Sequence, residues 1–143
     1  MQTAVVNRAF EMVFSPFGQS LRDRLMCNII ALRQAMEQQG FVVGGTPSPI
    51  CPVFVGEEPL ARITAKHLVR LGLLANLVEF PGVAKGRARF RFQVMAIHTG
   101  QEIESAAAIM AEAYRVASAE LQQFHASKLS APKVHPNSIP ATV

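Results

Sequence analysis

The segment from Ala88 to Val94 alternates without a break between apolar and polar side chains. The apolar members are Ala88, Phe90, Phe92 and Val94, and the polar members are Arg89, Arg91 and Gln93. Successive side chains of a β-strand point to opposite faces of a sheet, so this alternation predicts a strand with one buried and one open face. The apolar face requires a core, and the cationic face requires water, an anion or another domain.

The rest of the chain predicts an α+β fold around this strand. Turn residues and apolar periodicity indicate helices over 3–14, 19–39, 59–71 and 99–124, and strands over 41–43, 50–55, 75–80 and 88–94. Short connections between neighbouring strands favour a mostly antiparallel sheet of three to four strands with helices packed on one face. The other face of that sheet then has no cover, and it carries the arginines.

Local signals predict where several elements begin, end or meet. Thr99 and Glu102 fit a capping box, in which each side chain accepts a hydrogen bond from a free amide at the start of a helix. Pro52 lies within 50–55, an apolar run suited to an inner strand, but a proline there needs a sheet edge or a non-bonding site. The segment 15–18 contains Pro and Gly and is predicted to separate the first helix from the second.

Length and composition indicate one globular domain. The chain has 143 residues, half of them apolar, which is enough to bury a core and excludes a disordered chain. Its net charge of +4 is mild, and much of the basic charge is local, in Lys85, Arg87, Arg89 and Arg91. A local cluster of this kind is weak evidence for a nucleic-acid partner, and we expect none.

No segment indicates export or insertion into a membrane. No apolar run approaches the roughly 18 residues that span a bilayer, and a basic region followed by an apolar run is missing at the N-terminus. Cys27 and Cys51 fall in a predicted helix and a predicted strand, and we expect both to be buried, reduced thiols. No spacing of Cys and His suggests a metal site. Together these features predict a cytoplasmic protein without a transmembrane segment.

Five segments form an ordered set of short motifs. Residues 48–56 read Ser-Pro-Ile-Cys-Pro-Val-Phe-Val-Gly and fit the pattern S-x-I-x-P-V-x-x-G. The segments 71–76, 80–86, 88–91 and 95–99 follow it in the chain. In this order and spacing, the set resembles the α-oxoamine synthase family, whose pyridoxal-phosphate enzymes condense an amino acid with an acyl thioester. The resemblance covers residues 18 to 122 and concerns only the small C-terminal domain of these fold-type I enzymes.

The resemblance implies one substrate-binding residue and one supporting residue. Arg91, the second arginine of the Ala-Arg-x-Arg motif, matches the family residue that binds the α-carboxylate of the amino-acid substrate. Arg89 lies on the same polar face and is expected to support it. The plain alternative for Arg91 is an exposed strand residue that only contacts water. No residue matches a catalytic group or a metal ligand of the family. None matches its cofactor lysine either, because Lys66 and Lys85 do not fit the lysine motif.

The resemblance also implies how the chain is organised. Residues 1–17 are expected to form a linking helix from a missing large domain, 18–125 the C-terminal small domain, and 126–143 a disordered tail. A large domain, in cis or in trans, would supply the lysine that binds pyridoxal phosphate, so we expect the chain alone to be inactive. The complete enzyme would act on an amino acid and an acyl-CoA, and the family is homodimeric. The family loop Pro-x-Val-Pro reads Pro-Gly-Val-Ala over 81–84. Because the second proline is missing, the resemblance does not indicate which acyl chain the enzyme would accept.

Two other functions fit parts of the sequence. The chain could be a non-catalytic partner or subunit of a split pyridoxal-phosphate enzyme, docked through its arginine face on a separate chain. The segment 85–92 also overlaps the sheet motif of an RNA-binding α/β module, but both positions that would stack on bases are arginines, Arg87 and Arg89. His67 and His98 are expected to pack or to cap rather than to transfer protons.

Overall fold

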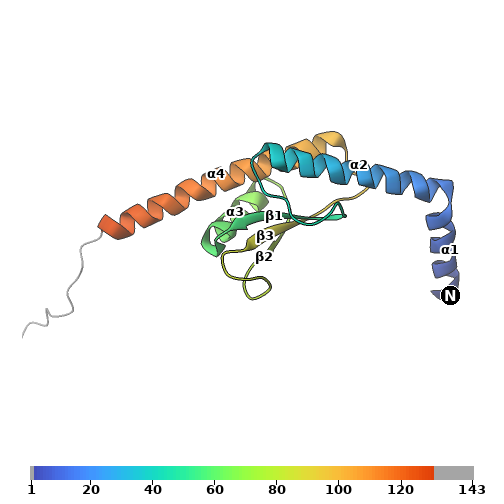
Figure 1. The fold of residues 1–143 in the computed structure, drawn as a ribbon, viewed down its shortest axis with the longest axis horizontal. Coiled ribbons are helices and arrows are strands. Elements are labelled where there is room, and N and C mark those ends of the chain that lie inside the picture. Colours follow the sequence, from blue (N-terminus) through green and yellow to red (C-terminus); the bar gives the residue numbers. More distant parts are fainter. Residues whose placement is uncertain (1, 131–143) are drawn as a thin grey trace, which may run out of the picture.

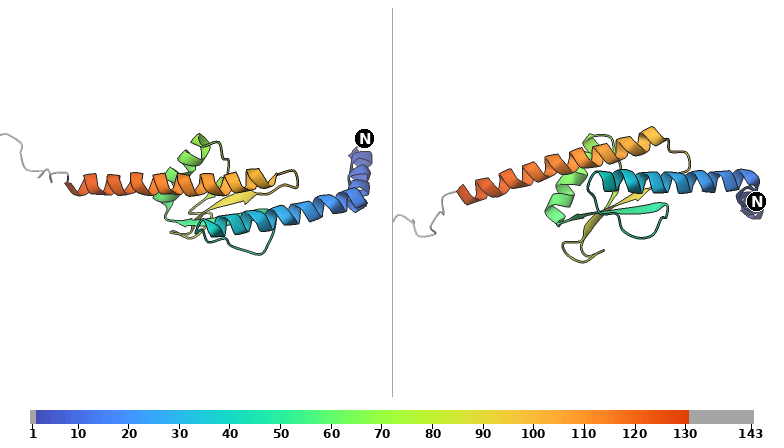
Figure 2. Two further views of the ribbon diagram at one scale, coloured as in Figure 1. Left: turned by 90° about the horizontal axis from the view of Figure 1, so that it is seen from above. Right: turned by 45° about the horizontal axis from the view of Figure 1, so that its top comes forward.

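The computed structural model of the protein describes residues 2–130. The elements are α1 (Gln2–Phe14), α2 (Pro16–Gln38), β1 (Ile50–Gly56), α3 (Glu58–Arg70), β2 (Asn76–Val78), β3 (Ala88–Gln93) and α4 (Gly100–Ser130). Figure 1 shows α2 and α4 running side by side above the sheet, with α1 bent away at one end and α4 extending past the sheet at the other. Two further views show the same arrangement (Figure 2). The predicted α+β class is confirmed.

The three strands form one antiparallel sheet in the order β1-β3-β2. The two-faced strand β3 is therefore the central one, paired with β1 on one side and with β2 on the other. Its apolar face is buried: Phe90 is fully buried and Phe92 is 5% exposed. This placement gives β3 the largest share of the core among the strands, as its alternation predicts.

The core lies between the helices and one face of the sheet. Its buried residues come from α2, α3, α4 and all of the longer strands, and include Ile29, Met36, Cys51, Val53, Leu68, Phe90 and Met110. On α4, four residues along one side, Ile103, Ala107, Met110 and Ala117, are buried. The helices thus pack on one face only, and the opposite face of the sheet is open.

The predicted strand over 41–43 is reduced to a single bridge between Val43 and Val53. The reason is Pro52, which has no N–H to donate. The Gly44 N–H donates to the Pro52 carbonyl at 2.8 Å, but the return bond cannot form. The Gly44 carbonyl instead accepts a hydrogen bond from Arg33 at 2.9 Å. Pro52 therefore ends the ladder, and β1 is an outer strand rather than the inner strand that its apolar run suggests.

The second helix begins earlier than predicted, at Pro16. Ser15 caps it, because its hydroxyl oxygen accepts a hydrogen bond from the Gly18 N–H at 3.1 Å. Proline suits the first turn of a helix, where its missing N–H is not needed. Gly18 is helical and buried, and a Cβ at this position would clash with the carbonyl oxygens of Met12 and Val13. The glycine is thus required by close approach of α1, not by a turn.

Two further expectations are wrong, namely the burial of Cys27 and the end of the last helix. Cys27 is exposed on α2, whereas Cys51 is buried as predicted. Cys27 precedes the part of α2 that packs on the sheet, where Ile29, Leu32 and Met36 take the core positions. The last helix does not end at residue 124, since α4 continues to Ser130, and the rest of the predicted disordered tail lies outside the described residues.

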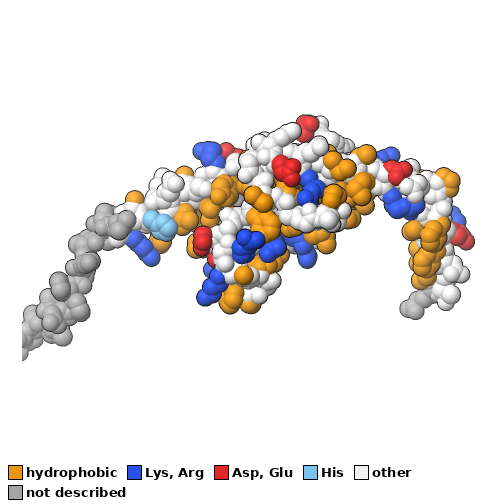
Figure 3. Space-filling view, in the orientation of Figure 1, with side chains coloured by type: hydrophobic (Ala, Val, Ile, Leu, Met, Phe, Trp, Pro, Cys, Tyr) orange, Lys and Arg blue, Asp and Glu red, His pale blue; other side chains and the backbone are white. Residues whose placement is uncertain are grey.

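The first helix makes few contacts with the rest of the molecule. It touches only α2 among the elements of the described chain. Its apolar side chains are exposed, among them Val5, Val6, Phe10, Val13 and Phe14, the last of which is 78% exposed. Figure 3 shows apolar side chains exposed along the projecting helix. No helix within residues 2–130 is long and apolar enough to cross a membrane.

Candidate functional site

The open face of the sheet is the first candidate site, because it brings three arginines together without a covering element. We call the side chains of Arg87, Arg89, Arg91 and Gln93 the arginine face. They project from β3 and the residue before it, opposite to the buried Phe90. Basic side chains are visible over this part of the molecule in Figure 3. The predicted division of β3 into a buried and a cationic face is confirmed.

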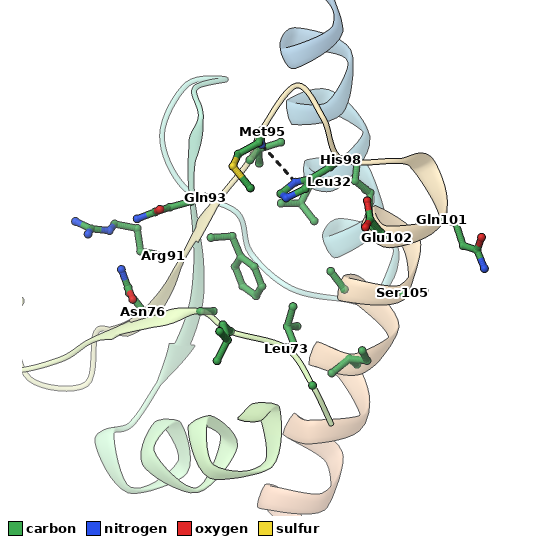
Figure 4. Close-up of a pocket in the computed structure, with 18 residues that line it drawn as sticks. Leu32, Leu73, Asn76, Arg91, Gln93, Met95, His98, Gln101, Glu102 and Ser105 are labelled. Carbon is green, nitrogen blue, oxygen red and sulfur yellow. Dashed lines mark hydrogen bonds between the residues drawn. The ribbon is translucent and has the colours of Figure 1, made fainter. Parts of the chain in front are cut away.

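Arg91 occupies the centre of this face. It pairs in register with Pro52 of β1 and with Asn76 of β2, so its side chain has one neighbour on each adjacent strand. Arg91 is exposed, and within residues 2–130 it forms no side-chain hydrogen bond or ion pair. Figure 4 shows its guanidinium directed away from α4, beside Gln93 and Asn76. A charged, unpaired guanidinium in this position is free to bind an anion.

Asn76 is a neighbour of Arg91 that sequence reasoning did not identify. Its side chain lies next to Arg91 in Figure 4, and Asn76 is exposed. An amide can donate two hydrogen bonds and can therefore contribute donors beside the guanidinium of Arg91. The pairing of Asn76 with Arg91 depends on strand register, which the three-residue strand β2 does not reveal in its sequence.

Arg89 is placed differently from Arg91, although both belong to the same face. Its guanidinium carbon lies 4.7 Å from the centre of the Phe54 ring, and that of Arg87 lies 5.3 Å from the same ring. Arg89 pairs in register with Phe54 of β1. Its Nε atom is buried and has no hydrogen-bond partner among the described residues. Arg89 therefore stacks on an aromatic ring and does not contact Arg91 by any hydrogen bond.

A hollow of about 680 Å³ lies beside the arginine face. It is bounded by the segment 72–76, the end of β3 and the first turns of α4. Leu32, Leu73 and Ile103 give it an apolar wall, and Asn76, Gln93 and Ser105 contribute polar groups. Figure 4 shows that Arg91 stands at the rim of the hollow with its guanidinium turned outward. The hollow and the arginine face thus adjoin at β3 and share Arg91 and Gln93.

The start of α4 is held by the predicted capping box, which is confirmed. The Thr99 N–H donates to the Glu102 carboxylate at 2.8 Å, and the Glu102 N–H donates to the Thr99 hydroxyl oxygen at 3.3 Å. The first of these bonds holds the pKa of Glu102 below its usual value. The cap fixes α4 directly after β3, so it also fixes one wall of the hollow.

His67 and His98 contact different groups. His98 accepts a hydrogen bond at Nδ1 from the Met95 N–H at 3.3 Å, which is a local capping contact of the kind expected. His67 Nε2 lies 2.8 Å from the Glu120 carboxylate and so joins α3 to α4. The sequence places no carboxylate near His67, because Glu120 is far away along the chain. Neither contact brings a histidine to the arginine face.

Acidic side chains are engaged elsewhere or lie at the margin of the site. Glu79 accepts hydrogen bonds from Arg62, which lower the pKa of its carboxyl group. Glu58 accepts a hydrogen bond from the Gly86 N–H at 3.0 Å and holds the loop before β3. Within residues 2–130, no group of three or more Cys, His, Asp or Glu side chains could hold a metal ion. The charged groups that the arginine face can offer a ligand are therefore its guanidiniums.

No family model matches the chain, but comparison with curated proteins finds related enzymes. It is 34% identical over 102 residues to an 8-amino-7-oxononanoate synthase from Citrifermentans bemidjiense, covering 71% of this chain and 26% of that protein. It is 37% identical over 89 residues to 2-amino-3-ketobutyrate coenzyme A ligase from Escherichia coli K12, covering 62% of this chain and 22% of that enzyme. The chain thus spans about a quarter of the length of the curated relatives it matches.

Solved structures agree with these relatives. Serine palmitoyltransferase from S. paucimobilis, determined with bound pyridoxal phosphate and myriocin, superposes with a TM-score of 0.64 at 25% identity, covering 71% of this chain and 26% of that chain. An 8-amino-7-oxononanoate synthase from Francisella tularensis superposes with a TM-score of 0.55 at 20% identity, covering 73% of this chain and 28% of that chain. The second match concerns the fold alone.

The described chain does not by itself fit pyridoxal phosphate, the cofactor in those serine palmitoyltransferase structures. Enzymes that use this cofactor hold it through a lysine. Lys66 lies 3.6 Å from the Glu120 carboxylate, Lys85 lies over the Phe80 ring and Lys128 lies on the far part of α4. None of these three lysines lines the hollow. Among residues 2–130, no lysine is therefore placed at the hollow to hold the cofactor.

Proposed function

We propose that this chain, which is homologous to the C-terminal domain of the α-oxoamine synthases, forms the part of such an enzyme that binds the amino-acid substrate. Arg91 binds the α-carboxylate of that substrate. The observation that supports this role most strongly is the position of Arg91 at the centre of an uncovered sheet face, exposed and without an ion pair among the described residues. Because no carboxylate among the described residues neutralises it, the guanidinium is available to a substrate carboxylate.

The chemistry of the side chain suits this role. A guanidinium is planar and always charged, and it can donate two parallel hydrogen bonds to the two oxygens of a carboxylate. Asn76, next to Arg91 on β2, can donate a further hydrogen bond to one of these oxygens. Because β3 is anchored by Phe90 and Phe92 in the core, the guanidinium starts from a rigid strand. The carboxylate is thereby held in one orientation, which is the contribution that binding makes to a selective reaction.

Arg89 supports this site electrostatically rather than by contact. It stands two residues from Arg91 on the same face, so its positive charge adds to the local attraction for an anion. Its own guanidinium is engaged with the Phe54 ring. We therefore assign substrate binding to Arg91 and a supporting role to Arg89.

A complete enzyme requires a second, larger unit that carries the cofactor lysine. In the proposed assembly, that unit lies in cis or in trans, covers the arginine face and meets α1, whose exposed strip includes Val6, Phe10 and Phe14. An exposed apolar strip along a projecting helix is typical of an interface with another protein unit. The assembly condenses an amino acid with an acyl-CoA as a cytoplasmic homodimer, while the chain alone is inactive. Residues 1–17 belong to the link and 18–125 to the small domain.

Grafting the chain onto a relative tests the proposal. The C-terminal quarter of the Citrifermentans bemidjiense 8-amino-7-oxononanoate synthase would be replaced by this chain, and amino-acid dependence of the condensation would be measured. We expect Arg91→Gln to raise the KM for the amino acid by about 10- to 100-fold, since a hydrogen bond to a charged group contributes roughly 1.5–3 kcal/mol. Arg91→Lys keeps the charge but loses the planar fork, so it should restore only part of the binding.

The matched control is Arg70→Gln, which removes the same charge from an exposed position on α3. It should leave the KM for the amino acid unchanged. An equal rise in KM for Arg70→Gln and Arg91→Gln would reject the assignment. For the chain alone, treatment with pyridoxal phosphate, serine and borohydride should label no single lysine stoichiometrically, and such labelling would show that the cofactor site is not missing.

A further inference from the structure

One edge of the sheet is incomplete, because β2 is shorter than its partner β3. The ladder between them ends with Asn76 opposite Arg91, so Gln93 has no partner on the β2 side. The Val94 N–H donates to the Pro49 carbonyl oxygen at 2.8 Å, on the β1 side. Because the backbone groups of successive strand residues point to alternate neighbours, the N–H and the carbonyl of Gln93 point to the β2 side. Among residues 2–130, neither group has a hydrogen-bond partner.

The chain does not fill this place itself, because the residues before β2 are held at the end of α3. The register of the ladder would place Leu74 opposite Gln93. Gly72 instead ends α3 with a φ of 84°, and the Leu73 N–H donates to the Leu68 carbonyl oxygen at 2.9 Å. A glycine of positive φ with such a return bond is typical of a helix C-terminus. Leu74 therefore does not pair with β3, and it is 82% exposed.

The unpaired edge of Gln93 borders the hollow of about 680 Å³. Phe92 and Val94, its neighbours on the apolar face of β3, line this hollow. Leu73 and Ser105 line it as well, from the segment before β2 and from α4 (Figure 4). A strand added opposite Gln93 would direct the facing side chain to the arginine face. It would direct the side chains on either side of that residue into the hollow.

We propose that the open edge of Gln93 binds an extended segment of the larger unit, in which a polar, uncharged residue stands between two apolar ones. The segment exchanges two backbone hydrogen bonds with Gln93, as a strand does when it is added to the edge of a sheet. Its two apolar side chains cover the apolar wall of the hollow. Its central side chain lies beside Arg91 and is uncharged, because an acidic group would occupy the guanidinium and a basic group would be repelled.

Two observations favour the larger unit as the source of this segment. The chain spans about a quarter of the length of its curated relatives, so most of each relative lies outside the part that matches. The hollow also shares Arg91 and Gln93 with the arginine face, so a unit that covers this face reaches the open edge without a break. The choice of source rests on the proposed function, whereas the binding surface depends only on the geometry at Gln93.

Nuclear magnetic resonance of the full 143-residue chain, titrated with the peptide acetyl-Thr-Val-Thr-Val-Thr-amide, tests the surface. Before the peptide is added, the Gln93 N–H should exchange with solvent at least about tenfold faster than the paired N–H of Val94. We expect saturable shifts at Gln93, and its exchange should slow about tenfold or more at saturation. A peptide that is N-methylated at its central threonine should not bind, because it has no N–H for the Gln93 carbonyl.

Two pairs of variants locate the contact. Gln93→Pro removes the N–H at the open edge and should weaken peptide binding about fivefold or more. Gln93→Ala changes the side chain but keeps the N–H, so it should weaken binding less than about twofold. Ser105→Trp places a ring in the hollow and should weaken binding about fivefold or more, whereas Ala108→Trp adds the same ring to α4 outside the hollow and should not. Ser105 is exposed, so its variant decides the test if Gln93→Pro does not fold.

The grafted enzyme tests the source of the segment. There the Gln93 N–H should exchange slowly without any peptide, because the larger unit already covers it. A graft in which Gln93 remains as unprotected as in the isolated chain would overturn the proposal. So would peptide binding that survives N-methylation, or equal losses in Ser105→Trp and Ala108→Trp. A graft that needs Arg91 for its amino acid, together with a chain that binds no peptide, would overturn this inference alone and leave the proposed function in place.

Discussion

Paired substitutions on β3 test whether its two faces play different roles. Phe90 and Arg91 are neighbours on the central strand but point to opposite sides of the sheet. Phe90 is fully buried in the core, whereas Arg91 is exposed and has no partner among the described residues. Phe90→Ala and Arg91→Ala therefore remove side chains from the same strand with opposite expected consequences.

The magnitudes follow from burial. Truncating a fully buried phenylalanine removes its transfer free energy and leaves a cavity, which together lower the free energy of unfolding by about 3–5 kcal/mol. Truncating an exposed arginine that has no partner changes it by no more than about 0.5 kcal/mol. Phe90→Leu keeps most of the apolar volume and should cost about 1–1.5 kcal/mol, which keeps the comparison measurable if Phe90→Ala unfolds the chain.

Urea denaturation followed by circular dichroism measures these differences as shifts of the midpoint at constant slope. The slope should be the same in Arg91→Ala and in the unmodified chain. A destabilisation by Arg91→Ala as large as that by Phe90→Ala would refute the reasoning. The guanidinium would then be part of the structure of the fold, and it could not be the free group that the proposed function requires.

Three further predictions concern the elements that position the site. Thr99→Ala should lower the free energy of unfolding by about 1 kcal/mol through loss of the cap of α4, and Thr99→Ser should not. Gly18→Ala, which would stabilise an ordinary helix, should instead increase hydrogen exchange in α1, because the new Cβ clashes with the Met12 carbonyl oxygen. The hydrogen bond from His67 lowers the pKa of Glu120. The stabilisation from Glu120 is thus fully present above the ordinary glutamate pKa and is lost as the pH falls through the lowered pKa of Glu120, so the midpoint difference from Glu120→Gln should vanish in acid.

The main features of the fold are predictable because they depend on local patterns. The alternation around Phe90 predicts both faces of β3 without knowledge of its neighbours. The cap at Thr99 and Glu102 is likewise a contact between residues close in sequence, and it forms as predicted. The α+β class follows from these elements and their short connections. Each of these features is determined within a few residues.

The features that were predicted wrongly depend on contacts between distant segments. The strand over 41–43 failed because Pro52 interrupts its pairing, and the carbonyl freed at Gly44 turns to Arg33. The exposure of Cys27 depends on how far α2 extends past the core. The apolar pattern of a helix does not by itself indicate where the sheet that the helix packs on ends.

The details of the candidate site were only partly predictable for the same reason. Arg91 and Arg89 could be named from their motif and their alternation. The neighbours that distinguish them could not, because Asn76 and Phe54 are brought to them by strand register. A short strand such as β2 carries too little pattern to fix its register from sequence.

The reactivity of Arg91 toward phenylglyoxal, followed by mass spectrometry of peptides, tests the central claim most directly. In the isolated chain Arg91 should react faster than Arg62, which is paired with Glu79 at 2.8 Å. In the grafted enzyme, adding the amino-acid substrate should protect Arg91 and leave Arg70 unprotected. An Arg91 that reacts no faster than Arg62 in the isolated chain, or that gains no protection from the amino acid, would contradict a free guanidinium that binds the substrate carboxylate.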